Sequence, residues 1–407
     1  MDKMADFFRL LKLYIKYIRD NHFSASRPII SRLTRSGIRV INFRGKRRFV
    51  EKLKNEWKEF LKGVSLFPEH CKGRGIVICA GGIRYLTCAW VNIKLLRKHG
   101  CKLPIEVWYT TGELTDEVID ALSALDVTCK NVKDYTDRKV SGFALKPFAI
   151  CNSAFIEVLF LDADNNATVD PTFLFESNEY QAYGALFWPD FWKTDKMNPI
   201  WKIIESDAYH EYEQESGQLL INKEKCWKEL NLCLYFNLDD RYAKLLYGDK
   251  DTFKFAWSAL RSRYFMIKTP VGFCGFSDTA NKIYSWGMSM VQHDFEGNII
   301  FVHRNLFKWD ITSDDETAWR SIKRFKVDAK EKRFYFIDVD VREKNPFHAF
   351  DIAGDIEIVD FKELLGDFEM GCLQILKELR CTEFYKRFLL YSYFSTFSPG
   401  FLHRRSN

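Results

Sequence analysis

The chain has 407 residues, 47% of them apolar and 29% charged, so it is long enough for one large or two smaller domains and too apolar for a disordered protein. Its net charge of +6 is uneven, because residues 1–62 carry 17 Lys and Arg against 6 Asp and Glu, which leaves the rest of the chain net negative. The eleven cysteines form no Cys-x-x-Cys pair, which argues against a zinc ribbon or a complete disulfide framework and favours a reducing compartment.

The N-terminal residues have the pattern of a basic amphipathic helix. Residues 3–19 place aromatic and aliphatic side chains on one helical face, with Arg and Lys opposite. Such a helix either binds an anionic membrane surface or packs on its own domain with a solvated basic face. The basic run continues through residues 32–48, which include Arg39, and suits lipid phosphates better than nucleic acid, for which no binding motif is present. A further helix is predicted at residues 51–62.

The pattern then changes to alternating strands and helices. Residues 76–80 form a buried strand that runs into Gly81 and Gly82 and then into a helix at 85–99. Glycines at such a turn allow a ligand to approach the backbone closely, and the helix N-terminus favours an anion. Arg84 is placed to contact a phosphate there. The turn alone is weak evidence, because many α/β proteins turn in this way without a ligand.

The next elements repeat this alternation. Strands are predicted at 105–109 and 127–132, with a helix at 115–125 between them. Right-handed crossovers would make a parallel sheet with a ligand crevice at the carboxyl ends of its strands.

Residues 144–164 are a helix that leads into a buried strand, which ends at Asp162-Ala163-Asp164. Two aspartates at the end of a strand can bind one hard divalent cation, and such a cation keeps positions open for substrate phosphates. The alternative is an acidic turn with no ligand, since Asp and Asn are ordinary turn residues. Lys146, at the start of the helix, is placed to offset phosphate charge, although it, like Arg84, could instead be a solvated charge at a helix end.

Later motifs add aromatic and acidic side chains. Trp188, Asp190 and Trp192 follow a short strand and suggest either a sugar platform, in which indole rings stack on the sugar, or a hydrophobic corner capped by Asp190. Residues 215–218 lead into a predicted strand at 219–222. The later predicted elements are a helix around residues 227–235, a helix that begins near 247–251, and strands at 298–302 and 334–341.

Taken in order, these motifs resemble the fungal α-mannosyltransferases of glycosyltransferase family 71. The resemblance covers roughly residues 74–310. The motifs are Gly81-Gly82, Leu-Pro-Ile-Glu-Val-Trp-Tyr at 103–109, Leu-Lys-Pro-Phe-Ala-Ile at 145–150, Leu-Asp-Ala-Asp-Asn at 161–165, Phe-Trp-Pro-Asp-Phe-Trp at 187–192, Glu-Ser-Gly-Gln at 215–218, Tyr-Gly-Asp-Lys-Asp-Thr-Phe at 247–253, and the regions around His293 and His303.

The resemblance implies a GT-A type, Rossmann-like α/β fold with a mixed sheet flanked by helices. We expect a basic helical region over 1–72, this domain over 73–325, and an α+β C-terminal extension over 326–407. Fungal members carry an N-terminal signal anchor, whereas this sequence has a basic segment and no run of about twenty apolar residues. We therefore expect a cytoplasmic, peripheral membrane protein, and a Golgi lumenal one only if an anchor is missing from this sequence.

The function implied is transfer of mannose from GDP-mannose to a glycan or glycolipid acceptor, with retention of configuration and with Mn²⁺ or Mg²⁺. The alternatives are a UDP-glucose or UDP-galactose donor, or a non-catalytic carbohydrate- or lipid-binding module. The candidate metal ligands are Asp164, which would bind the cation directly, Asp162, which would bind it through water or hold the nucleotide ribose, and His303, with His293 in reserve. The candidate donor-binding residues are Gly81, Gly82, Arg84, Lys146, Asp162, Trp188, Gly217 and Gln218. The candidate catalytic carboxylates are Asp190, Glu215 and Asp249.

Overall fold

The computed structural model describes residues 31–34, 37–41, 47–208, 211–246, 248–278, 283–339 and 347–397. The amphipathic segment predicted at residues 3–19 lies outside the described residues, as does Tyr247.

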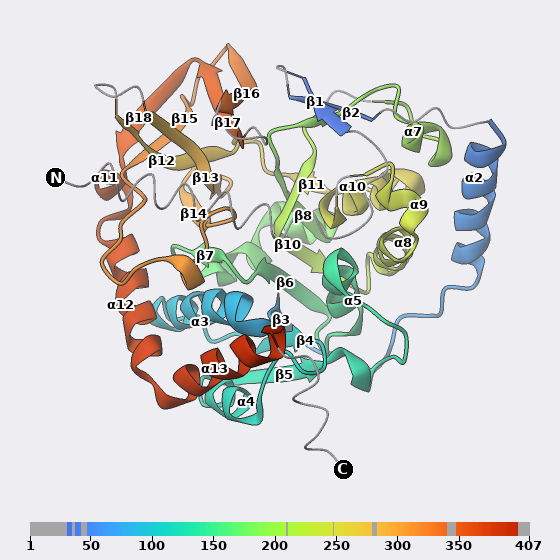
Figure 1. The fold of residues 1–407 in the computed structure, drawn as a ribbon. Helices are drawn as coiled ribbons and strands as arrows, with labels where there is room; N and C mark the ends of the chain where they lie inside the picture. The colour runs from blue at the N-terminus through green and yellow to red at the C-terminus, as the bar shows by residue number, and fades with distance from the viewer. Residues whose placement is uncertain are drawn as a thin grey trace.

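A seven-stranded sheet forms the centre of the molecule (Figure 1), in the order β11-β8-β10-β6-β3-β4-β5. Its strands are β3 Arg74–Cys79, β4 Ile105–Tyr109, β5 Val127–Asn131, β6 Glu157–Asp162, β8 Ala185–Pro189, β10 Gln214–Asn222 and β11 Phe265–Met266. Strands β3, β4, β5 and β6 are parallel, as the strand and helix pattern predicts. Strand β10 is antiparallel to both β6 and β8, so the sheet is mixed and the predicted fold class is confirmed.

Helices cover both faces of this sheet because its buried strands alternate their side chains between two cores. In β3, Ile76 and Ile78 pack into one core and Val77 into the other. One core takes in α3 Gly82–Lys98, α4 Asp116–Ser123, α12 Phe368–Cys381 and α13 Glu383–Phe397. The other takes in α2 Arg47–Lys62, α5 Leu145–Asn152, α7 Ile200–Ile203, α8 Trp227–Leu238, α9 Asp240–Ala243 and α10 Asp249–Leu260.

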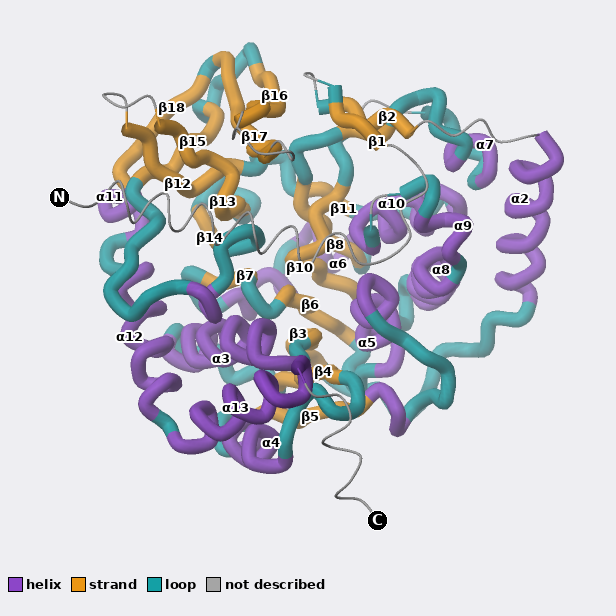
Figure 2. Tube along the Cα trace, in the orientation of Figure 1, coloured by secondary structure: helices purple, strands orange, loops and turns teal. Residues whose placement is uncertain are grey.

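A second sheet lies beside the central one, in the order β18-β15-β12-β13-β14-β7, with every neighbouring pair antiparallel. Its strands are β7 Asn165–Ala167, β12 Gly272–Asp278, β13 Ile283–His293, β14 Ile299–His303, β15 Ser321–Phe325 and β18 Ile356–Asp360. Figure 2 shows the strands of the two sheets as separate groups, with most helices around the central one. Strand β18 pairs with β15, which ends at Phe325, so this sheet combines residues from both sides of the predicted boundary.

The remaining elements are small. Strands β1 Ser31–Leu33, β2 Ile38–Ile41 and β9 Lys193–Thr194 form a three-stranded sheet, and β16 Lys332–Val339 pairs with β17 Phe347–Gly354. Short helices are α6 Asn178–Tyr183 and α11 Phe361–Leu365, with 3₁₀ turns at Val132–Asp134, Gly142–Ala144, Pro171–Glu176 and Trp309–Ile311. All eleven cysteines are unpaired thiols. Among the described residues, the helices are too short or too polar to cross a bilayer.

One predicted boundary is wrong and affects the site. Residues 215–218 were expected to precede the strand at 219–222, but β10 already begins at Gln214. The polar residues stay in the strand because Glu215 pairs with Trp188 of β8 and Gln218 pairs with Leu161 of β6. Strand β10 therefore carries its polar side chains alongside the end of β6.

Candidate active site

The Asp-Ala-Asp motif is the connection between the two sheets. Asp162 is the last residue of β6 in the central sheet, and Asn165 is the first residue of β7 in the second sheet. Asn165 pairs with His303 at the end of β14, and the next amide, that of Arg304, donates a hydrogen bond to the carbonyl of Asp164 at 2.9 Å. This pairing brings together two motifs about 140 residues apart in sequence.

Three side chains form a compact group that can hold a divalent cation. Asp162, Glu215 and His303 each offer one ligand atom, and these atoms lie within 4.8 Å of one another. Carboxylate oxygens suit Mg²⁺ or Mn²⁺, and an imidazole nitrogen suits transition metals. The Asp162 side chain is 28% exposed, whereas those of Glu215 and His303 are buried, so the group opens outward on the Asp162 side. The group shares Asp162 and His303 with the predicted set, and it adds Glu215.

Asp164, the remaining predicted ligand, lies beside this group and is held by two cationic side chains. Its Oδ1 is 3.2 Å from His303 Nε2, and its Oδ2 accepts from the ammonium of Lys308. Burial by itself would raise the pKa of Asp164, but the charges of Lys308 and His303 outweigh burial and hold this pKa well below its usual range. Asp164 is thus a permanent anion that orients His303.

Lys146, in the first turn of α5, pairs with Asp162 of this group. Its ammonium lies 3.0 Å from Asp162 Oδ1 and 2.8 Å from Asp249 Oδ2, and it donates to the carbonyl of Ser216 at 2.8 Å. Burial opposes this charge, but Asp162 and Asp249 outweigh burial and raise the pKa of Lys146. Lys146 therefore ties four elements together at the site, namely α5, β6, β10 and the start of α10.

Lys250 connects the other two predicted carboxylates. Its ammonium lies 2.5 Å from Asp190 Oδ2 and 3.7 Å from Glu215 Oε2. Burial raises the pKa of Asp190 to about 7, although Lys250 pulls it down. Its carboxyl group therefore changes protonation near neutral pH, which is a property of acid–base groups at active sites.

Several buried polar atoms at the site have no hydrogen-bond partner among the described residues. They are His303 Nδ1, Asn165 Oδ1 and Gln218 Nε2. Asn165 and Gln218 are linked through a 2.6 Å hydrogen bond between the Asn165 amide and Gln218 Oε1. Buried polar groups are normally satisfied in folded proteins, so unpaired donors and acceptors that converge on one place fit a site for a polar ligand or ion.

The sequence predicts that a ligand lies close to the Gly-Gly turn, and in the structure a side chain of the protein lies there. Gly82 has φ +66°, a conformation that favours glycine, but a Cβ on Gly81 would collide with the carboxylate of Glu113. The close approach in this structure is therefore to Glu113. Arg84 lies 3.4 Å from Asp310, which follows Lys308 by two residues. The predicted contacts of this turn and of Arg84 with a donor remain predictions.

The aromatic loop does not present open indole faces. Trp188 is fully buried, donates to the carbonyl of His293 and packs edge-on against Phe301. The ring of Trp192 lies beneath Lys250, 4.1 Å from its ammonium. The positions of both rings support the hydrophobic-corner alternative, and the predicted donor contact of Trp188 gains no support from this structure.

His293, the reserve ligand, lies elsewhere on the β13–β14 hairpin. It pairs with Ile299, whereas His303 pairs with Met290. Burial, with a smaller contribution from Arg324, lowers the pKa of His293 to about 4, so it is a neutral core histidine.

Sequence reasoning missed Lys250 and Lys308. Each is next or close to a predicted site residue, Asp249 or His303, and that proximity was the available signal. An isolated lysine is common on protein surfaces, and only the tertiary structure buries these two against carboxylates.

Comparisons with known proteins identify the family of the chain. The model of the mannosyltransferase family Mannosyl_trans3 matches residues 73–211 and 204–294, together more than half of the chain. This match contains every candidate site residue except His303.

Two fungal relatives are similar to about half of the chain. The α-1,2-mannosyltransferase MNN24 of Candida albicans is 30% identical over 270 residues, which are 54% of this chain and 38% of the relative. The α-1,2-mannosyltransferase MNN5 of Saccharomyces cerevisiae is 28% identical over 288 residues, 54% of this chain and 49% of the relative. The chain thus spans less than half the length of these relatives.

Among solved structures, the glycosyltransferase GlyE of Streptococcus pneumoniae overlaps with a TM-score of 0.34 at 17% identity, over 48% of this chain and 46% of that one. The galactosyltransferase LgtC overlaps with a TM-score of 0.32 at 16% identity, over 44% of this chain and 69% of that one. Both overlaps are partial. On the family match, the chain is a member of the Mannosyl_trans3 family of mannosyltransferases.

Proposed function

We propose that the chain is a metal-dependent α-mannosyltransferase that transfers mannose from GDP-mannose to a glycan or glycolipid acceptor with retention. The observation that carries this proposal is the group of Asp162, Glu215 and His303, flanked by the buried cations Lys146 and Lys308. A nucleotide diphosphate is a polyanion, and a divalent cation between carboxylates and phosphates offsets its charge.

A bound cation would supply Lewis acidity to the leaving diphosphate. Asp162, Glu215 and His303 would hold it, and Mn²⁺ fits their mixed oxygen and nitrogen donors. Asp164 orients the His303 ring through its 3.2 Å contact with Nε2. Lys308 pairs with Asp164 through its buried ammonium, and a cation at this position would also offset phosphate charge.

The carboxylates deeper in the site serve the sugar. Glycosyl transfer passes through a state with positive charge at the anomeric carbon, and an anion nearby stabilises it. Asp190 and Glu215 share Lys250 and lie together, so they are suited to this electrostatic role and to holding acceptor hydroxyls. Asp249 is engaged by Lys146 and by the hydroxyl of Ser216, and it therefore positions Lys146.

The test is a panel of labelled nucleotide sugars, incubated with the full chain and an oligomannoside acceptor in Mn²⁺, in Mg²⁺ or in EDTA. We expect donor hydrolysis and transfer with GDP-mannose, loss of both in EDTA, and an α-linked product. Asp162→Asn should lower turnover by at least about a hundredfold, because it removes a charged ligand. Asp126→Asn, on an exposed aspartate whose side chain is 86% accessible, is the isosteric control and should be neutral.

Other results have clear meanings. Turnover only with a UDP-hexose would keep the mechanism and change the donor. Binding of a nucleotide sugar without hydrolysis or transfer would favour the non-catalytic module. Full activity in EDTA, or in Asp162→Asn, would contradict the proposed metal site, and a β-linked product would contradict retention.

A further inference from the structure

The loop that follows His303 is largely irregular and carries Lys308, which pairs with Asp164. Residues 304–312 leave β14 and contain Lys308, whose ammonium reaches Asp164. The segment has one short 3₁₀ turn, at Trp309–Ile311. Because an irregular segment has few hydrogen bonds of its own, its position depends on what it packs against.

A buried guanidinium lies at the centre of this loop. Arg304 is fully buried, with its guanidinium carbon 3.9 Å from the centre of the Trp309 ring and 4.9 Å from that of Trp319. It donates to the Thr312 hydroxyl at 3.0 Å, and this hydroxyl donates to the carbonyl of Lys308, also at 3.0 Å. The position of the Lys308 backbone therefore depends on where Arg304 is held.

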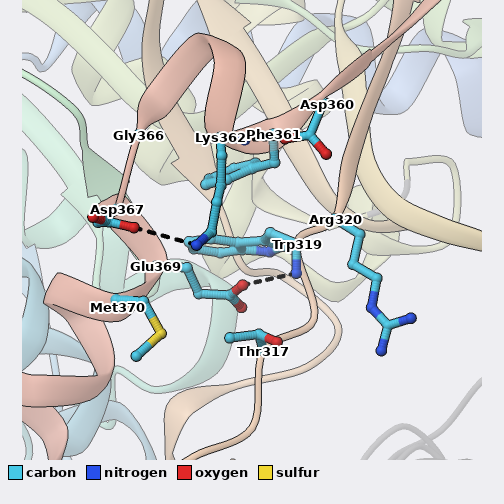
Figure 3. Close-up of a pocket in the computed structure, with 10 residues that line it drawn as sticks. All are labelled: Thr317, Trp319, Arg320, Asp360, Phe361, Lys362, Gly366, Asp367, Glu369 and Met370. Carbon is cyan, nitrogen blue, oxygen red and sulfur yellow. Dashed lines mark hydrogen bonds and ion pairs between the residues drawn. The ribbon is translucent and has the colours of Figure 1, made fainter.

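Glu369 of α12 holds Arg304. Its Oε1 accepts from Arg304 at 3.1 Å and from the amide of Ala318 at 2.8 Å, and its Oε2 accepts from the amide of Trp319 at 2.9 Å. Figure 3 shows this carboxylate pointing toward the Trp319 backbone from the first turn of α12. A buried charge needs such complete hydrogen bonding to be tolerated.

The other end of α12 makes a second connection to the same loop. Arg380 donates to the carbonyls of Trp309 and Asp310 at 3.3 and 3.2 Å, and it forms an ion pair with Asp314 at 2.6 Å. The helix itself packs on α3, which begins at the Gly-Gly turn. Thus α12 contacts the loop at two points about three helical turns apart.

We infer that α12, which lies beyond the residues matched by the family model, fixes the 304–312 loop, and that Glu369 is a positioning residue that sets Lys308 against Asp164. This inference rests on the proposed function, because it assigns Lys308 to the donor side of that site. Partners in the outer shell of a metal or phosphate site are typically worth about tenfold or more in affinity or activity.

If Glu369 only stabilised the fold, its loss should have the same effects as the loss of another buried carboxylate charge. The pair Lys323–Asp351, at 2.7 Å, is a second buried ion pair outside the site, and Asp351 is as buried as Glu369. Asp351→Asn therefore reproduces the loss of a buried carboxylate charge without touching the loop. It is the matched control for Glu369→Gln.

The experiment compares the full chain with Glu369→Gln, Asp351→Asn and the milder Arg380→Gln, whose side chain is 25% exposed in the native protein. GDP is titrated calorimetrically in the presence of Mn²⁺, and KM is measured separately for donor and acceptor. Hydrogen exchange is followed at the backbone amides of residues 304–312, and thermal unfolding reports stability.

We expect Glu369→Gln to weaken GDP binding and raise the donor KM by about tenfold, with the acceptor KM unchanged and exchange protection lost in the loop. Arg380→Gln should act in the same direction but less. Asp351→Asn should lower stability and leave GDP binding and loop protection as in the wild type. Should Glu369→Gln not fold, Arg380→Gln decides by the same measurements.

The inference is overturned if Glu369→Gln and Arg380→Gln keep wild-type loop protection, or if the wild type binds GDP and these two variants bind it no differently from Asp351→Asn. Loop exchange is independent of catalysis. A wild-type chain that transfers no sugar would therefore contradict the proposed function, while the exchange data would still decide whether α12 holds the loop.

Discussion

Gly217 lies in close contact with the His303 ring. A Cβ at position 217 would lie 2.6 Å from His303 Nδ1 and 2.7 Å from its Cε1, closer than real contacts allow. The backbone at this position does not require glycine, because no positive φ is recorded for it. The absence of a side chain is therefore needed only so that the imidazole can sit between Glu215 and Asp164.

We predict that Gly217→Ala displaces the His303 ring, lowers Mn²⁺ affinity by about tenfold and costs about 1–3 kcal/mol of stability. Mn²⁺ titration and urea unfolding measure the two effects. Gly63→Ala is the control, because the nearest atom to a Cβ there is the Phe60 carbonyl at 3.6 Å, an ordinary contact. Unchanged Mn²⁺ affinity in Gly217→Ala would mean that His303 is not a ligand.

For single residues, the sequence identified the acidic side chains of the site better than the lysines that pair with them. Asp162, Glu215 and His303 were all singled out, and the structure brings them together. The sequence could not show that Lys308 and Lys250 are buried ion-pair partners, because their shortest contacts, with Asp164 and Asp190, join segments 144 and 60 residues apart. A charge pattern in one segment carries no information about such pairing.

At the scale of elements, strand β2 places the basic residue Arg39 in an environment that the sequence does not predict. Arg39 belongs to the run predicted to face lipid phosphates, but it is buried, with its guanidinium 2.7 Å from Asp251 of α10 and stacked near Trp192. That expectation is wrong for Arg39. The reason is that β2 pairs with β9 and so carries Arg39 into the core beside α10.

We predict that Arg39→Met destabilises the protein by about 3–5 kcal/mol, because it leaves the charge of Asp251 buried without its cation. The double variant Arg39→Met, Asp251→Leu should recover much of this loss, since it removes both charges. Urea unfolding of the single and double variants measures the effect. As a control, Lys62→Met breaks the exposed pair with Glu59 and should change stability little. If the double variant is no more stable than the single one, the loss comes from packing and the ion pair is not its cause.

For the whole molecule, the two sheets explain where the site is. The chain leaves the central sheet at Asp162 and enters the second sheet at Asn165, so residues 162–164 are held at both ends. The site therefore depends on both sheets and, through α12, on the C-terminal helices.

The N-terminal segment is the part of the whole molecule that remains a prediction from sequence. The sequence of residues 3–19 predicts a helix with its basic side chains on one face, and we propose that this face binds an anionic membrane near a membrane-linked acceptor. In the full chain, Lys12→Glu with Lys16→Glu should abolish flotation with phosphatidylserine vesicles. The wild type should float at low salt and less at about 0.5 M, where charges are screened within a few ångströms.

The matched control for this experiment is Lys196→Glu with Lys202→Glu, which makes the same charge change at two exposed lysines of the folded part. It should float like the wild type. An equal loss of flotation in both double variants would mean that binding depends on the net charge of the protein and not on the N-terminal segment. Flotation unaffected by Lys12→Glu with Lys16→Glu would contradict the proposal.

The sequence by itself determined the alternating α/β order, the parallel strands β3 to β6 and the acidic motif at the end of β6, because hydrophobic periodicity and turn residues are local signals. It did not determine the antiparallel entry of β10, the second sheet or the burial of Lys146, Lys250 and Lys308 against carboxylates. Those features arise from pairing between distant segments, such as His303 with Asn165 and Arg304 with Glu369. Only the tertiary structure sets which polar groups are removed from water together, and that decides which of them pair with each other and which are left for a ligand.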